Sequence, residues 1–298
     1  MSWILITVGA AALQVARNAL QRGLLASAGP WGATLARFLF GLPFSGLFAL
    51  GALVLLPHRP LTPGARFGVA CAVAAASQVA ATAALLVSMR RAGFAAATVL
   101  QQSSILLAAL TGIALGDRLG PLAWTGLACV TAGTAAIAWP RRSAGRADVS
   151  GAALGLAAGA GFAIAANAAR QASLALDAVD PFVAALVSVF SVQALQSAAL
   201  GAWLAWRAPV ALKATLRAGA ASLGAGFFGA AASGLWFTAF ALAPAGLVRA
   251  VGVVEAPIAA VAGRRLFAER LSARQWAAAA MAAAGVVLVS VGHGAARG

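Results

Sequence analysis

The residues best suited to binding a solute are polar side chains inside otherwise apolar runs of the chain. Gln14, Arg17 and Asn18 lie on one helical face of the first run, together with Gln21, and Asn167 and Arg170 repeat this stripe in the sixth run. The remaining polar candidates are Gln78 in the third run, Thr98, Gln101 and Gln102 in the fourth, and Gln193 in the seventh. Amides and hydroxyls can bond both an ammonium and a carboxylate, so the set suits a zwitterion or another polar metabolite. The alternative is hydrogen bonding between helices, worth about 0.6 kcal/mol per contact on average.

Glu255 is an acid deep inside the ninth apolar run, where an ionisable side chain is costly and therefore a candidate for function. Arg249 lies six positions earlier, about 240° around an ideal helix, so it is not expected to pair along the same face. Two hypotheses follow. An unpaired Glu255 could bind a substrate ammonium or a coupling proton, whereas a Glu255 paired with Arg17, Arg37 or Arg170 would orient helices.

Two aromatic residues of the eighth run, Trp236 and Phe240, are four positions apart and so share a helix face. They could stack on a ring or cover a cation in a cavity, or they could simply pack in the bundle. No grouping of nucleophile and base, no metal-ligand spacing and no phosphate-binding loop occurs, so neither an enzyme nor a metal or cofactor is expected.

Composition places the chain in a membrane. It is 62% hydrophobic and only 9% charged, against roughly 25% charged residues in soluble proteins. The net charge of +15 comes from arginines at the ends of apolar runs, where they can reach lipid headgroups, so nucleic-acid binding is not expected.

Ten apolar runs predict an all-α integral membrane protein with ten transmembrane helices. The runs are Trp3–Leu20, Trp31–Leu56, Phe67–Met89, Phe94–Gly116, Pro121–Trp139, Val149–Leu176, Pro181–Trp206, Ala218–Ala243, Gly246–Phe267 and Gln275–Gly292. The fifth and tenth runs carry no charge or amide in their centres and are expected to face lipid. Glycines spaced four apart, at 151, 155 and 159 and at 112 and 116, predict close helix packing.

The chain also matches itself. At a shift of 152, Asp117-Arg118-Leu119 falls on Glu269-Arg270-Leu271, Trp124 on Trp276 and Gly133 on Gly285. This predicts repeats at 1–140 and 149–293, joined by a loop at 141–148. Because five helices is an odd number, the second repeat must be inverted in the membrane, with substrate bound between the halves.

The acidic-Arg-Leu turns, Gly116-Asp117-Arg118-Leu119 and Ala268-Glu269-Arg270-Leu271, are similar to those of ten-helix EamA-type members of the drug/metabolite transporter superfamily. Pro257 and the segment 241–246 add to this resemblance, which covers nearly the whole chain. The resemblance implies export of small metabolites, amino acids prominent among them, across the bacterial inner membrane. It also implies a central cavity that excludes the fifth and tenth helices.

The resulting expectation is a secondary transporter whose partners are a small-molecule substrate and the lipid bilayer. The oligomeric state is left open, a monomer being plausible. Export of drugs or other amphipathic metabolites, or a non-transporting role in membrane assembly, are the alternatives. Thirteen basic residues follow the odd-numbered runs and four follow the even-numbered runs, which places both termini outside by the positive-inside rule. The resemblance implies cytoplasmic termini instead. At the 152-residue shift Ser103 corresponds to Glu255, so the two halves differ at this position.

Overall fold

The computed structural model describes residues 2–92, 97, 100–138, 149–176, 180–255 and 273–295. All regular structure in these residues is helical, and five helices are long and apolar enough to cross a membrane. These five are Ala28–Leu55, Ala65–Ser88, Val149–Ala175, Pro181–Arg207 and Ser222–Leu242. Shorter apolar stretches occupy Ser2–Arg17, Ser104–Ala114, Ala245–Val254 and Ala280–Gly292. The predicted all-helical class is therefore confirmed for these residues, and the five long apolar helices are candidate membrane spans.

The chain divides into two compact units, and each draws on both halves of the sequence. Unit 1 contains residues 1–79 and 165–243, and unit 2 contains residues 80–164 and 244–298. The helices α3 (Ala65–Arg91) and α7 (Val149–Ala175) contribute residues to both units. The compact units thus differ in composition from the two consecutive repeats predicted from the sequence. The predicted connecting loop, 141–148, lies outside the described residues.

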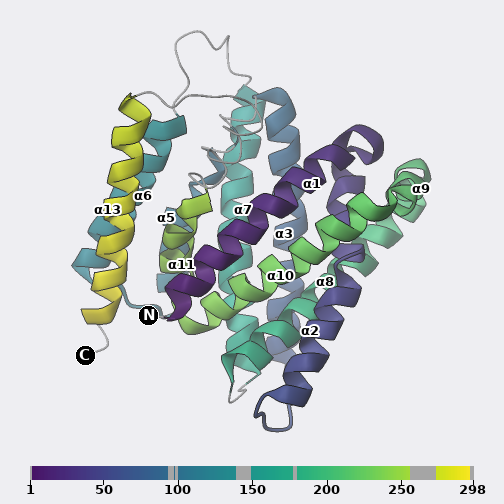
Figure 1. Cartoon of the computed structure of the whole chain (residues 1–298), viewed down its shortest axis with the longest axis horizontal. Helices are drawn as coiled ribbons and strands as arrows, with labels where there is room; N and C mark the ends of the chain where they lie inside the picture. The colour runs from purple at the N-terminus through teal and green to yellow at the C-terminus, as the bar shows by residue number, and fades with distance from the viewer. Residues whose placement is uncertain are drawn as a thin grey trace. The chain divides into compact units, whose positions relative to one another are not determined.

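Unit 1 is organised around α1 (Ser2–Leu39) and α10 (Gly219–Leu242), which lie side by side in Figure 1. Gly29 has φ 66° and precedes Pro30, and together they kink α1 into two limbs. The second limb packs beside the first, where the Gln21 side-chain amide donates to the Ala33 carbonyl at 2.9 Å. The kink lies in the gap between the first two predicted apolar runs.

Three further helices complete unit 1. They are α2 (Leu42–Leu55), α8 (Pro181–Arg207) and the short α9 (Pro209–Arg217). Asp180 caps α8 by accepting a hydrogen bond from the Phe182 amide at 2.7 Å, and Pro181 occupies the first helical position, where its missing N–H costs nothing. Residues 209–217 therefore form a helix where the sequence predicts only a connection.

Unit 2 contains α5 (Ser104–Ala114), α6 (Pro121–Ala138), α11 (Ala245–Val251), the 3₁₀ turn η1 (Gly252–Val254) and α13 (Ala273–Ala295). Of the glycines assigned to packing, those of α7 are confirmed. A methyl at Gly151 would meet the Ala92 nitrogen at 2.8 Å, and one at Gly155 would meet the Leu100 Cβ at 2.8 Å.

Gly116 has a different role from the one predicted, since it ends α5 rather than packing a helix face. Its φ is 96°, and its amide donates to the Ile113 carbonyl while the Asp117 amide donates to the Gly112 carbonyl, both at 2.9 Å. This is the hydrogen-bond pattern of a Schellman motif, which needs a residue that tolerates positive φ.

The α6 and α13 helices pack against each other through glycine (Figure 1). A methyl at Gly126 would stand 2.7 Å from the Gly285 carbonyl oxygen, and one at Gly133 would stand 2.7 Å from the Ala278 carbonyl oxygen. Residue numbers rise along α6 as they fall along α13, so the two helices are antiparallel. Adding 152 to 126 gives 278, and subtracting 152 from 285 gives 133. The Gly126–Gly285 contact therefore corresponds to the Ala278–Gly133 contact under the 152-residue shift. We call this contact the α6–α13 seam.

Candidate functional site

In unit 1, the polar face of α1 meets the aromatic face of α10. The Trp236 indole Nε1 donates to the Gln14 Oε1 at 3.0 Å, and the Trp236 ring stacks on Phe240 with centroids 5.7 Å apart. Both rings are buried. Sequence candidates from the first and eighth runs are thus brought together in direct contact, with the indole N–H satisfied as a buried Trp requires.

Arg170 stabilises the end of α10. Its guanidinium donates to the Phe240 carbonyl at 2.6 Å and to the Ala243 carbonyl at 3.0 Å. These carbonyls lie in the last turn and at the C-cap of α10, where no intrahelical donor remains and the helix dipole favours a cation. These two hydrogen bonds give Arg170 a capping role at the end of α10. Asn167, one turn earlier on α7, is buried.

Two glutamines on α8 differ sharply. Gln196 donates through its Nε2 to the Gln78 Oε1 at 2.8 Å, joining α8 to α3. Gln193, one turn earlier and 2% exposed, has no hydrogen-bond partner among the described residues at either its Nε2 or its Oε1. Gln196, the partner of Gln78, is not among the candidate residues drawn from the sequence.

Arg17 is buried near a second buried arginine, Arg37, and the two guanidinium charges repel each other. Arg37 lies on the second limb of α1, with its guanidinium carbon 5.0 Å from the centroid of the Phe38 ring. From the sequence, Arg37 is only a possible partner of Glu255. Its position nevertheless indicates a site residue, because Arg37 lies six residues inside an apolar run and does not flank that run.

Two other candidates cannot be placed. Thr98 lies outside the described residues, and so does the side chain of Asn18.

In unit 2, helix breaks occur at matching positions of the fourth and ninth predicted runs. Residues 102 and 103 form a turn ahead of α5, so half-buried Gln101 and Gln102 lie at an interruption instead of within one continuous helix. Residues 252–254 form the 3₁₀ turn η1 after α11. At the 152-residue shift these breaks overlap at one position, since residue 102 falls on residue 254. The α5 helix packs on α11, where a methyl at Gly246 would meet the Ala109 Cα at 2.6 Å.

Glu255 does interact with Arg249, contrary to the helical-wheel expectation. The structure has an electrostatic attraction between the Glu255 carboxylate and the Arg249 guanidinium, which also donates to the Ser104 Oγ at 2.7 Å. The physical reason is η1, because each residue of a 3₁₀ helix rotates the chain about the helix axis by about 120°, against about 100° in an α-helix. Its three residues therefore add roughly 60° of rotation. Glu255 therefore lies about 60° from the Arg249 direction around the helix axis, where an ideal α-helix would put it about 120° away. Arg249 and Glu255 bridge the two helix breaks through Ser104.

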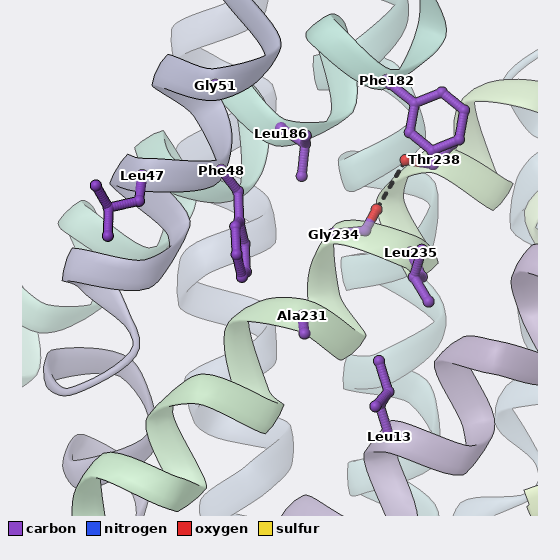
Figure 2. Close-up of a pocket in the computed structure, with 10 residues that line it drawn as sticks. All are labelled: Leu13, Leu47, Phe48, Gly51, Phe182, Leu186, Ala231, Gly234, Leu235 and Thr238. Carbon is purple, nitrogen blue, oxygen red and sulfur yellow. Dashed lines mark hydrogen bonds between the residues drawn. The ribbon is translucent and has the colours of Figure 1, made fainter.

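A cavity of about 430 Å³ lies in unit 1 between α1, α2, α8 and α10. Figure 2 shows its lining, which consists of Leu13, Leu47, Phe48, Gly51, Phe182, Leu186, Ala231, Gly234, Leu235 and Thr238. The one hydroxyl in this lining, on Thr238, donates to the Gly234 carbonyl at 2.8 Å within α10. The lining therefore offers carbon and aromatic surface to an occupant. This cavity was not foreseen, because its residues come from four helices and none is polar enough to attract attention in the sequence.

The fold is shared with solved structures. One, described only as the crystal structure of a protein, superposes with a TM-score of 0.68 over 97% of this chain and 96% of that chain, at 18% sequence identity. At that identity the similarity concerns the fold alone. No protein-family model matches the chain, and no curated protein matches it.

Proposed function

We propose that this chain is a secondary transporter that moves small metabolites, amino acids above all, across the inner membrane by alternating access. The observation that carries this proposal is the pair of interrupted helices in unit 2, at 102–103 and 252–254, which overlap at residue 254 when 152 is added to the first pair. Interrupted helices in corresponding positions of two halves are the best pointer to a transporter binding site, because their freed backbone groups and helix ends can hold polar solutes. The bridge from Arg249 to Ser104 and Glu255 places ionisable groups at this break.

The proposed architecture is ten transmembrane helices in two inverted five-helix repeats, as in EamA-type transporters. The α6–α13 seam supports it, since helices that correspond in an inverted repeat must be antiparallel, and the seam contacts exchange at the shift of 152 residues. Each compact unit also contains corresponding parts of both predicted repeats. On this proposal the two halves rock about the midplane, closing one mouth of the cavity as the other opens.

The test is transport by the purified chain in proteoliposomes, using a panel of labelled amino acids with external and internal loading. We expect counterflow of at least one amino acid, and we expect it to require Arg249 and Glu255. A matched control is Arg59→Gln, because Arg59 is exposed in the loop after α2. If no amino acid crosses faster than in empty liposomes, the amino-acid proposal is wrong.

A second candidate function is export of drugs or amphipathic metabolites, favoured by the apolar cavity of Figure 2. Apolar pockets with few polar groups are typical of sites for such ligands. The same liposomes loaded with a fluorescent lipophilic cation distinguish the two, because this function predicts dye efflux that Gly234→Leu blocks. Failure of every solute to cross would favour the non-transporting assembly role.

A further inference from the structure

Two tryptophans from different helices of unit 1 meet where α8 ends. Trp31 lies at the start of the second limb of α1, and Trp203 lies in the last two turns of α8. Their ring centroids are 5.0 Å apart, and each side chain is more than one-third exposed. Trp206, about one turn further along α8, is 77% exposed. Indole rings at the ends of membrane helices normally lie at the level of the lipid headgroups.

The short helix α9 packs on the same end of unit 1. A methyl at Gly32, the residue after Trp31, would stand 2.7 Å from the Thr215 Oγ of α9. Residues Ala208, Ala211 and Leu212 pack against a buried cluster formed by Leu35, Leu200 and Leu204. One face of α9 is therefore held against the other helices, and Figure 1 shows α9 next to the end of α10 that it precedes.

The opposite face of α9 is exposed and carries two cations. Lys213 and Arg217 are four positions apart, so they share a helix face, and both are exposed. Val210 and Leu216 flank them around the helix and are 80% and 53% exposed. Basic residues beside exposed apolar ones are typical of a helix that lies in the interface of a bilayer.

A third cation, Arg207, ends α8 at this place. Its guanidinium carbon lies 4.9 Å from the centroid of the Trp206 ring. The only acids in the sequence of unit 1 are Asp177 and Asp180, which precede α8. The 27-residue α8 separates Asp180 from Arg207 by about 40 Å, at 1.5 Å per residue. Unit 1 therefore has a basic end whose charge complements an anion.

The ends of three candidate membrane spans place this surface at the edge of a bilayer. Ala28–Leu55 begins here, Pro181–Arg207 ends here, and Ser222–Leu242 begins five residues after Arg217. Side chains at the ends of spans reach the polar interface that borders the hydrocarbon core. A negatively charged group available at that depth is the phosphate of a lipid.

We propose that an exposed surface of six residues binds the headgroups of anionic phospholipids. We call it the α9 surface, and its residues are Trp31, Trp203, Trp206, Arg207, Lys213 and Arg217. Guanidinium groups match phosphate oxygens with paired charge-assisted hydrogen bonds, and the lysine ammonium adds a point charge. Indole N–H groups donate to the same oxygens, while Val210 and Leu216 contact the acyl chains.

A lipid fits this surface better than an acidic protein segment does. An acidic segment satisfies the cations alone, whereas a phospholipid also covers exposed indole and aliphatic carbon. The inference requires only that the candidate spans lie in a bilayer, and it holds whatever solute the chain transports.

Native mass spectrometry of the full chain in a neutral detergent measures the affinity. Phosphatidylglycerol and phosphatidylcholine with identical acyl chains are titrated separately, and glycerol 3-phosphate serves as a headgroup without acyl chains. Phosphatidylglycerol should bind at least about five-fold more tightly than phosphatidylcholine, because each basic residue near an anionic lipid surface strengthens binding by about that factor. Glycerol 3-phosphate should not displace it.

The variant Lys213→Gln with Arg217→Gln should weaken phosphatidylglycerol binding about five- to 25-fold and leave phosphatidylcholine binding unchanged. Lys213→Arg keeps the charge and should bind as the native chain does. The matched control is Arg59→Gln with Arg66→Gln, which removes the same charge beyond the far end of the span Ala28–Leu55 and should keep the native affinity. All four side chains are exposed, so both double variants should fold.

Hydrogen exchange locates the bound lipid. In nanodiscs, phosphatidylglycerol in place of phosphatidylcholine should slow the exchange of the backbone amides at 209–217, because a bound headgroup opposes local opening of α9. The native chain and the control variant should show this protection, and the Lys213→Gln, Arg217→Gln variant should lack it.

Equal affinity for the two lipids, an equal loss in both double variants, or unchanged exchange at 209–217 would each overturn the α9 surface. Displacement of phosphatidylglycerol by glycerol 3-phosphate would assign the cations to a free phosphate. Tighter binding of a deca-glutamate peptide than of phosphatidylglycerol would assign them to an acidic protein. Either of these results would also overturn the lipid assignment.

Discussion

Gly226→Ala should destabilise unit 1, because this glycine is where α10 lies against the backbone of the turn between α1 and α2. A methyl there would overlap the Phe40 carbonyl carbon and oxygen and would stand 2.7 Å from the Gly41 nitrogen. All three are backbone atoms, so no side chain can move aside. Reaching an ordinary contact of 3.4 Å from the Gly41 nitrogen requires a shift of about 0.7 Å.

The expected loss follows from two opposing effects. Overpacking of this kind costs about 1–3 kcal/mol, and overlap with backbone puts it at the upper end. Alanine recovers about 1 kcal/mol of helix propensity relative to glycine. The net loss should therefore be about 2 kcal/mol in the free energy of unfolding, and the Phe40–Gly41 turn, which follows Arg37, should move with it.

Gly224→Ala is the matched control on the same helix. Its methyl would meet only the Leu20 Cδ1, at 3.2 Å, and that atom is the end of a flexible side chain. This variant should be neutral or gain about 0.5 kcal/mol from helix propensity. Both free energies of unfolding can be measured by titration with sodium dodecyl sulfate in mixed micelles. If Gly226→Ala is as stable as Gly224→Ala, the close approach of α10 to residues 40 and 41 is wrong.

Glu255→Gln and Arg249→Gln should each lower the free energy of unfolding by about 2 kcal/mol. This is less than the roughly 3–5 kcal/mol expected for a fully buried pair, because Glu255 is half-buried. Strictly additive losses in the double variant would contradict their pairing. Gly285→Ala should cost up to about 2 kcal/mol after its gain in helix propensity, because its methyl would stand 2.7 Å from the Gly126 oxygen and the Val130 nitrogen. Gly51→Ala meets nothing within 4 Å and should be neutral or gain up to about 1 kcal/mol in the same titration. Trp236→Phe keeps the ring stack on Phe240 but loses the bond to Gln14, so it should cost about 1 kcal/mol. An unchanged free energy of unfolding for Trp236→Phe would mean that this hydrogen bond has no net effect on stability.

The helical membrane class could be predicted because hydropathy and length are properties of each segment alone. The break at Pro30 and the cap at Asp180–Pro181 are equally local, since they depend on a missing N–H and on a nearby acceptor. The role of Gly116 was misassigned because a four-residue glycine spacing suits both a packing face and a helix end. Only the backbone angle distinguishes them.

The candidate site was predictable in type but not in pairing. Gln193 and Gln196 have the same side chain, helix and burial, yet Gln196 has a partner on α3 and Gln193 has none within the described part of the chain. That difference depends on which residue of another helix lies opposite. The expectation that Arg249 lies away from Glu255 failed for a local reason, since a three-residue 3₁₀ turn changed the angular register that an ideal helix assumes.

The α6–α13 seam has the form of an isologous interface, in which one surface meets a copy of itself. Contacts of this form normally join separate subunits, so their presence within one chain suits an ancestor of half the length that associated as an antiparallel homodimer. In such a dimer any substitution in the seam would have acted twice. In the present chain the corresponding positions, Val130 and Ala282, already differ, and the Val130 side chain lies opposite Gly285 where the Ala282 methyl group lies opposite Gly133. On the proposed inverted repeat, fusion of the halves would let one side of the seam gain bulk without the same change on the other side.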